Sequence, residues 1–81
     1  MKIEWAKKGL ESLNVLEKEV SKKIVKKINE LKENFRYFNI KRLEGSDLFR
    51  IRVGDYRVIF EIWNNIIYIL KVGHRKNIYK R

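Results

Sequence analysis

The feature that most restricts the fold of this sequence is a run of three apolar segments separated by two pairs of turn residues. All three segments are rich in the β-branched and aromatic side chains that are typical of strands. They are Phe49–Val53, Tyr56–Ile62 and Ile66–Val72. The intervening pairs, Gly54-Asp55 and Asn64-Asn65, suit two-residue hairpin loops that need a positive φ. The second half of the chain therefore predicts an antiparallel three-strand meander.

The first hairpin of this meander has an unusual charge pattern. A two-residue loop at Gly54-Asp55 places Arg52 opposite Arg57. Strand alternation then separates an apolar side from a basic side. The apolar side holds Ile51, Val53, Val58, Phe60 and Ile62, and the basic side holds Arg50, Arg52 and Arg57. Like charges opposite each other cost up to about 1 kcal/mol, so this pattern indicates either a polyanion-binding face or charges that prevent strand aggregation.

The second hairpin predicts how the basic side continues. A two-residue loop at Asn64-Asn65 places three pairs opposite each other. These pairs are Arg57 with Val72, Ile59 with Leu70, and Glu61 with Tyr68. The apolar part of this face is then expected to be covered by the C-terminal residues or left for a partner.

The N-terminal half predicts one strand and two helices. Alternation around Ile3 and Trp5 indicates a short strand. Helical spacing follows, first with Leu10, Leu13 and Leu16 on one face, and then with Val20, Ile24, Ile28 and Leu31 on another. We expect a corner near Asn14, a helix end at Asn34 and a loop from Phe35 to Ile40. The prediction is one α+β domain over residues 1–81 in the order β-α-α-β-β-β, with the helices on one sheet face and a basic cleft on the other.

Composition narrows the possible functions. The 81 residues include 20 Lys plus Arg against 10 Asp plus Glu, a net charge of +10 that is typical of a protein that binds a polyanion. The chain has no cysteine, which excludes disulfides, thiolate metal sites and a cysteine nucleophile. Because it also has a single histidine, we expect no metal or other cofactor. The longest apolar run, Ile66–Leu70, is too short to span a bilayer, so a cytoplasmic location is predicted.

RNA cleavage is one reaction that this set of residues could support. The ribose 2′-OH can attack its own adjacent phosphate, so the protein only has to stabilise negative charge and transfer two protons. Arginine is suited to the first task because its planar fork binds phosphate and keeps its charge. For the protons, His74 and Tyr79 are candidates near the end of the last strand, where we expect the arginine side of the sheet.

Three stretches of the chain together resemble the RelE/ParE superfamily of prokaryotic toxins. They are Leu43-Glu44-Gly45, Leu48–Phe60 and Val72–Tyr79. The likeness extends over essentially the whole chain and is closest to the RelE branch. Its most specific part is the arginine-rich hairpin combined with the terminal Gly73-His74-Arg75-Lys76 and Tyr79.

The resemblance implies a toxin that cleaves mRNA in the decoding site of the ribosome and so stops translation. Its partners would be the ribosome, mRNA and a RelB-like antitoxin that covers the basic face in a heteromeric complex. The implied catalytic residues are Arg52, Arg57, His74, Arg75 and Tyr79, and the implied ligands of the RNA phosphate are Arg50, Arg52 and Lys76. Here Arg57 and Arg75 would stabilise the transition state, while Tyr79 would orient the nucleotide.

This chain has Arg50 and Arg52 where a well-studied relative has lysines. Arginine is a poor general base, so proton abstraction would pass to His74 or depend on Tyr79. Two other functions stay open at this point. The ParE branch shares the fold but inhibits DNA gyrase, and a homologue without catalysis would only bind nucleic acid.

Overall fold

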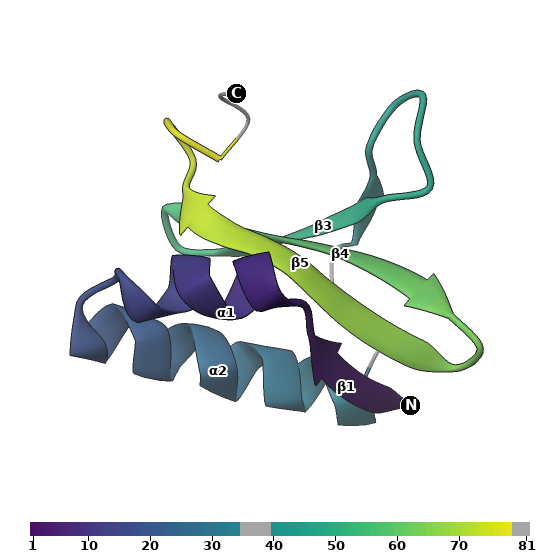
Figure 1. Ribbon diagram of the computed structural model, residues 1–81, viewed down its shortest axis with the longest axis horizontal. Coiled ribbons are helices and arrows are strands. Elements are labelled where there is room, and N and C mark those ends of the chain that lie inside the picture. The colour runs from purple at the N-terminus through teal and green to yellow at the C-terminus, as the bar shows by residue number, and fades with distance from the viewer. Residues whose placement is uncertain (35–39, 79–81) are drawn as a thin grey trace.

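The computed structural model describes residues 1–34 and 40–78 of the chain. Its elements are β1 (Lys2–Trp5), α1 (Lys7–Asn14), α2 (Lys18–Glu33), β2 (Lys41–Arg42), β3 (Phe49–Val53), β4 (Tyr56–Trp63) and β5 (Ile66–His74). The predicted α+β class and element order are confirmed, with one strand added (Figure 1). Strand β2 was not predicted because its two residues are both exposed and show no alternation of apolar and polar side chains.

The strands form one sheet in the order β1-β5-β4-β3-β2. The meander of β3, β4 and β5 is antiparallel, as predicted. Strand β1, however, runs parallel to β5, with Ile3 beside Ile67 and Trp5 beside Ile69. The sequence assigned no partner to this strand, because the partner lies more than 60 residues away and local patterns do not identify it.

Both hairpin turns have the backbone that their residues predict. Asn64 and Asn65 have φ values of 51° and 61°, the two positive values of a type I′ turn. Gly54 has a φ of 60°, which glycine adopts without strain. The predicted register of the first hairpin is confirmed, with Arg52 opposite Arg57.

The register of the second hairpin differs from the prediction over half of its length. Glu61 lies opposite Tyr68 as expected, but a bulge between Ile59 and Phe60 shifts the remaining pairs. Arg57 is therefore opposite Gly73, and Ile59 is opposite Lys71. A bulge reverses the side to which the following residues point, and nothing in the sequence marked it.

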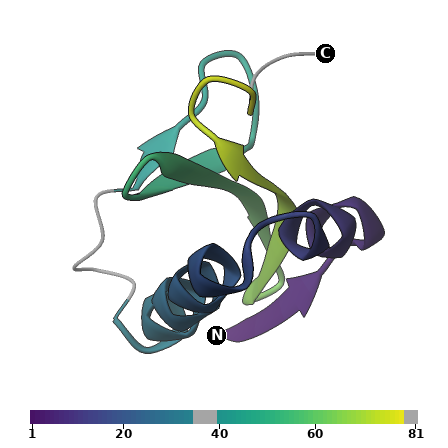
Figure 2. The same ribbon diagram turned by 90° about the vertical axis from the view of Figure 1, so that its left-hand side faces the viewer.

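The core lies between the sheet and the two helices. Both views show α1 and α2 on the same face of the sheet (Figures 1 and 2). The core cluster of buried residues comprises Leu13, Ile24, Ile28, Leu31, Ile51, Val58, Phe60, Ile67, Ile69 and Val72. Val72 belongs to this core because of the bulge, whereas the sequence placed it on the basic face. Over the described ranges, neither helix has the length and apolar character needed to cross a bilayer.

Helix α1 approaches β5 through a glycine. Gly9 and Leu13 are its buried residues, whereas Leu10, which we expected on the buried face, is 47% exposed. A Cβ atom at Gly9 would collide with the carbonyl oxygen of Ile69. The helix therefore lies closer to the strand than any residue with a side chain would allow, and helical spacing of leucines did not reveal this contact.

Beside this contact, the Ser12 side chain forms a hydrogen bond with the backbone of β5 at the edge of the sheet. Its Oγ accepts a hydrogen bond from the Val72 backbone N–H at 3.0 Å and donates one to the Gly9 carbonyl at 2.8 Å. The Ala6 N–H donates to the Ile69 carbonyl at 3.0 Å. These bonds pair polar groups of the strand beyond the short β1, so this part of the sheet edge is covered by the helix.

Replacing Ser12 by alanine is expected to lower the free energy of unfolding by about 1 kcal/mol, because the Val72 N–H loses its acceptor. Urea denaturation measures this change. Ser21 is a matched control, since its hydroxyl also donates to the carbonyl three residues earlier, Lys18, at an exposed site. Ser21→Ala should change stability by less than about 0.5 kcal/mol. Equal effects of the two substitutions would contradict the role of Ser12 at the edge.

Candidate nucleic-acid interface

The sheet face opposite the helices gathers basic side chains from four strands. Residues directly opposite in an antiparallel pair point to the same side, so the register defines the set. Lys71, Ile59, Arg50 and Lys41 form one row across β5, β4, β3 and β2, and Arg57 and Arg52 form the next. We call the group Lys41, Arg50, Arg52, Arg57 and Lys71 the basic face.

Two members of the basic face were not anticipated from the sequence. Lys41 joins it through β2, whose pairing brings it opposite Arg50. Lys71 joins it because the bulge turns its side chain away from the core and places it opposite Ile59. Neither could have been found without the missed strand and the bulge. The turn after β5 and the loop between β2 and β3 project from this side of the sheet (Figures 1 and 2).

Arg57 is the most buried charged residue of the face, with 8% of its surface exposed. Its Nη1 donates to the backbone carbonyls of Gly54 and Tyr56, at 3.0 and 2.9 Å. A guanidinium keeps its charge when buried and carries five N–H donors. One arm of its fork is thus anchored on the β3–β4 turn, which sets the direction of the positive charge.

Arg75 is attached to the same turn. Its backbone N–H donates to the Asp55 carbonyl at 2.7 Å, and its Nε lies 3.9 Å from Asp55 Oδ1. Both side chains are more than half exposed, so the ion pair contributes little stability. The backbone bond nevertheless fixes where Arg75 leaves the sheet. The two-residue turn therefore brings together Arg57 and Arg75, which are far apart in sequence.

His74 does not lie where the sequence analysis expected it. It is opposite Tyr56, and Tyr56 packs against the core on the helix side. The two rings pack edge to face, with 5.4 Å between their centroids and an angle of 83° between their planes. The neighbouring pair, Arg57 and Gly73, points to the other side of the sheet, so the imidazole and the Arg57 side chain leave opposite faces.

The apolar part of the basic face is smaller than predicted. Ile59 is 7% exposed and lies outside the core cluster, on the side of Arg50 and Lys71. Ile78, in the turn after β5, is also buried, and a Cβ at Gly73 would lie 3.2 Å from its Cδ1. The turn after β5 thus packs on Gly73, the residue opposite Arg57. Lys76 is exposed in this turn, and Tyr79 lies outside the described residues.

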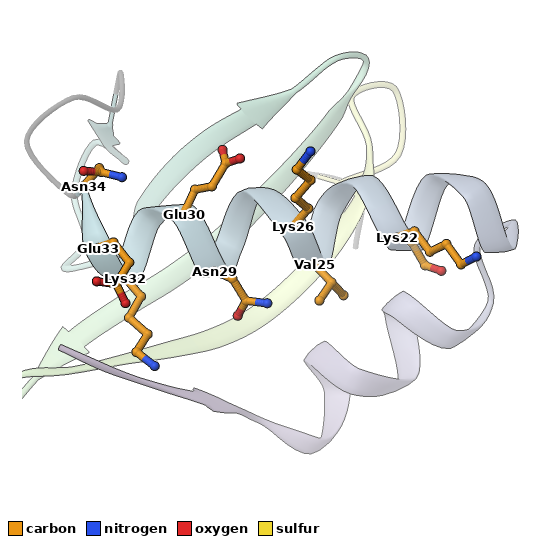
Figure 3. Close-up of a pocket in the computed structure, with 9 residues that line it drawn as sticks. Lys22, Val25, Lys26, Asn29, Glu30, Lys32, Glu33 and Asn34 are labelled. Carbon is orange, nitrogen blue, oxygen red and sulfur yellow. The ribbon is translucent and has the colours of Figure 1, made fainter.

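A hollow on the described surface lies away from the basic face. It lies along α2, and its described lining comes from that helix and the residue that ends it, including Lys22, Val25, Lys26 and Asn29 (Figure 3). It is shallow and open, and its described lining includes none of the arginines and not His74. Lys22 and Lys26 are exposed on this helix. We therefore place the site on the basic face.

The chemistry available on the basic face is that of anion binding. Among residues 1–34 and 40–78, no group of three or more His, Asp or Glu side chains is placed to hold a metal ion. Arginine forks bind phosphate in a bidentate manner. Arg52 and Arg57 lie directly opposite each other on β3 and β4, a pairing of like charges that a bound anion would favour. A phosphodiester backbone is an anion of this kind.

Known proteins with related sequences and folds are toxins. The chain is 33% identical over 84 residues to toxin RelE3 of Methanocaldococcus jannaschii, covering 98% of this chain and 96% of that protein. The RelB–RelE antitoxin–toxin complex of Methanococcus jannaschii aligns with a TM-score of 0.76 and 30% identity, covering 93% of each chain. The archaeal RelE–RelB complex of Pyrococcus horikoshii OT3 gives 0.73 and 30%, covering 94% and 96%.

The family assignment extends over nearly the whole length. The sequence profile of the ParE toxin of the type II toxin–antitoxin system, parDE, matches residues 3–79. The fold and the relatives agree with this match. The chain therefore belongs to the RelE/ParE superfamily of toxins of type II toxin–antitoxin systems.

Proposed function

We propose that this toxin is an endoribonuclease of the RelE type, which cleaves mRNA in the decoding site of the ribosome and inhibits translation. The observation that carries the proposal is that the β3–β4 turn accepts hydrogen bonds from the side chain of Arg57, a member of the basic face, and from the backbone of Arg75. The 33% sequence identity with an archaeal RelE toxin supports assigning this chain to the RelE branch of the superfamily.

The proposed reaction needs no external nucleophile. The ribose 2′-oxygen loses its proton and attacks the adjacent phosphorus, and the bond from phosphorus to the 5′-oxygen breaks as that oxygen gains a proton. Negative charge on the phosphoryl oxygens rises in the transition state, and positioned cations lower its energy. Arg57 and Arg75 supply this stabilisation, whereas Arg50, Arg52, Lys71 and Lys76 bind the flanking phosphates.

A RelB-like antitoxin is the proposed partner of the toxin. Both archaeal structures that resemble this chain are complexes of RelE with RelB. With a net charge of +10, the toxin attracts an acidic partner over long range, and such attraction falls with salt. An antitoxin that covers the basic face would compete with RNA for the same arginines.

Inhibition of DNA gyrase is the second candidate function, because the matching profile is described as ParE. The two are separated by assaying the same purified protein for protein synthesis in a cell extract and for supercoiling by gyrase. We expect protein synthesis to stop while supercoiling continues. Loss of supercoiling with protein synthesis intact would replace the nuclease proposal by the gyrase one.

A further inference from the structure

The turn that follows β5 is organised by a single residue, His74. The Lys76 backbone N–H donates to His74 Nδ1 at 3.1 Å. The N–H groups of Asn77 and Ile78 donate to the His74 carbonyl at 2.8 and 2.9 Å. A side-chain acceptor for the N–H two residues later, combined with a carbonyl that closes the turn, is the arrangement of a capping residue at the start of a helix.

The orientation of the imidazole is fixed from two directions. Because Nδ1 accepts the bond from Lys76, a neutral ring carries its proton on Nε2. The ring also rests on Tyr56, which packs against the hydrophobic core. The core thereby determines where the acceptor nitrogen lies, and the acceptor determines the path of the following backbone.

The capped turn carries two groups that bear on the basic face. Arg75 directly follows His74 and is bonded through its N–H to the β3–β4 turn. Ile78, the last described residue, is 2% exposed and lies against Gly73, which is opposite Arg57. Losing the cap would release the Lys76 N–H and loosen the segment that holds both of them.

We propose that His74 is a positioning residue, which caps the terminal turn and so holds Arg75 beside the β3–β4 turn. As an effect on cleavage, this inference rests on the proposed nuclease function. It differs from the general-base role that the sequence indicated. Nδ1 is already an acceptor for Lys76, and the imidazole and the Arg57 side chain leave opposite faces of the sheet.

The test compares His74→Asn with His74→Ala. An asparagine side-chain oxygen can accept the N–H two residues later, so it replaces the cap, but an amide cannot act as a general base. Hydrogen exchange of the Lys76 amide is measured together with cleavage of ribosome-bound mRNA. In His74→Ala we expect exchange to be about fivefold faster and cleavage to fall about fivefold or more. His74→Asn should stay within about twofold of the unsubstituted protein in both.

Two results would overturn the proposal. One is an unchanged Lys76 exchange rate in His74→Ala, which would show that the imidazole is no cap. The other is His74→Asn with normal exchange but cleavage as low as in His74→Ala, which would indicate proton transfer by His74. Asn77→Ala, an exposed neighbour in the same turn, serves as the control for both measurements. If the unsubstituted toxin cleaves no mRNA, the nuclease proposal fails separately, and the exchange rates still decide whether His74 is a cap.

Discussion

Replacing Arg57 by alanine is expected to lower the rate of mRNA cleavage by about 100- to 1,000-fold, the effect of removing one positioned donor from a developing negative charge. Arg57 is suited to a large effect because it is almost fully buried and its Nη1 is anchored by the Gly54 and Tyr56 carbonyls. A donor held in place before the reaction does not have to be ordered during it. Single-turnover cleavage of mRNA on ribosomes measures the change.

The same substitution removes hydrogen bonds from two backbone carbonyls, so its effect on folding must be measured separately. We expect Arg57→Ala to lose about 1–3 kcal/mol of stability, which urea denaturation reports. Arg57→Lys keeps the charge but lacks the fork, and it should recover stability more than activity. Lys22→Ala removes one charge from α2 and should leave cleavage nearly unchanged (Figure 3). Cleavage by folded Arg57→Ala at the normal rate would remove Arg57 from the site.

Replacing Gly9 by alanine is expected to destabilise the fold by about 2–3 kcal/mol, the usual cost of forcing an extra methyl into a packed contact. In a free helix the same change would stabilise by about 1 kcal/mol. The sign reverses here because the new Cβ would meet backbone atoms of Ile69 and Leu70, which have no rotamer to change. Helix α1 would have to move away from β5, breaking the Ser12 bond to Val72 as well.

Thermal unfolding measures the effect of Gly9→Ala, with an expected decrease in Tm of roughly 10–20 °C for a domain of this size. Glu11→Ala tests helix propensity alone, since Glu11 is exposed on the same helix, and its Tm should change little. A Gly9→Ala protein as stable as the unsubstituted one would show that α1 and β5 are further apart than described.

The part of the fold that could be predicted from sequence is the part set by local patterns. Strand alternation and turn residues gave the meander and the register of the first hairpin, including the opposed Arg52 and Arg57. Spacing of Ile24, Ile28 and Leu31 gave α2 and its buried face. In each case the residues that form the sequence pattern are the same residues that form the predicted structure.

The rest depends on contacts between distant residues. The parallel pairing of β1 with β5 joins the two ends of the chain, and the close approach at Gly9 is visible only when both elements are present. The bulge after Ile59 exchanged Val72 for Lys71 on the basic face and moved Gly73 next to Arg57. It thereby changed the candidate site, because a shift of one residue turns every following side chain to the other face.

The role of His74 also could not be predicted from local sequence. A histidine between Gly73 and Arg75 in a basic protein suggested proton transfer, because imidazole titrates near neutral pH. Its register opposite Tyr56 and its bond from the Lys76 N–H instead give it a structural environment. Residue type and sequence position could not distinguish the two roles of His74, because each role depends on which side of the sheet its side chain occupies at the end of β5.

In the proposed function, the basic face binds and cleaves mRNA that the ribosome holds. The most direct test is primer extension on an mRNA incubated with the purified toxin, with ribosomes and without them, beside the folded Arg57→Lys variant. We expect new 5′ ends within codons that ribosomes occupy, no such ends on free RNA, and a strong decrease with the variant. Intact mRNA on ribosomes that the toxin binds, or equal cleavage by the variant, would contradict the proposed nuclease function of the basic face.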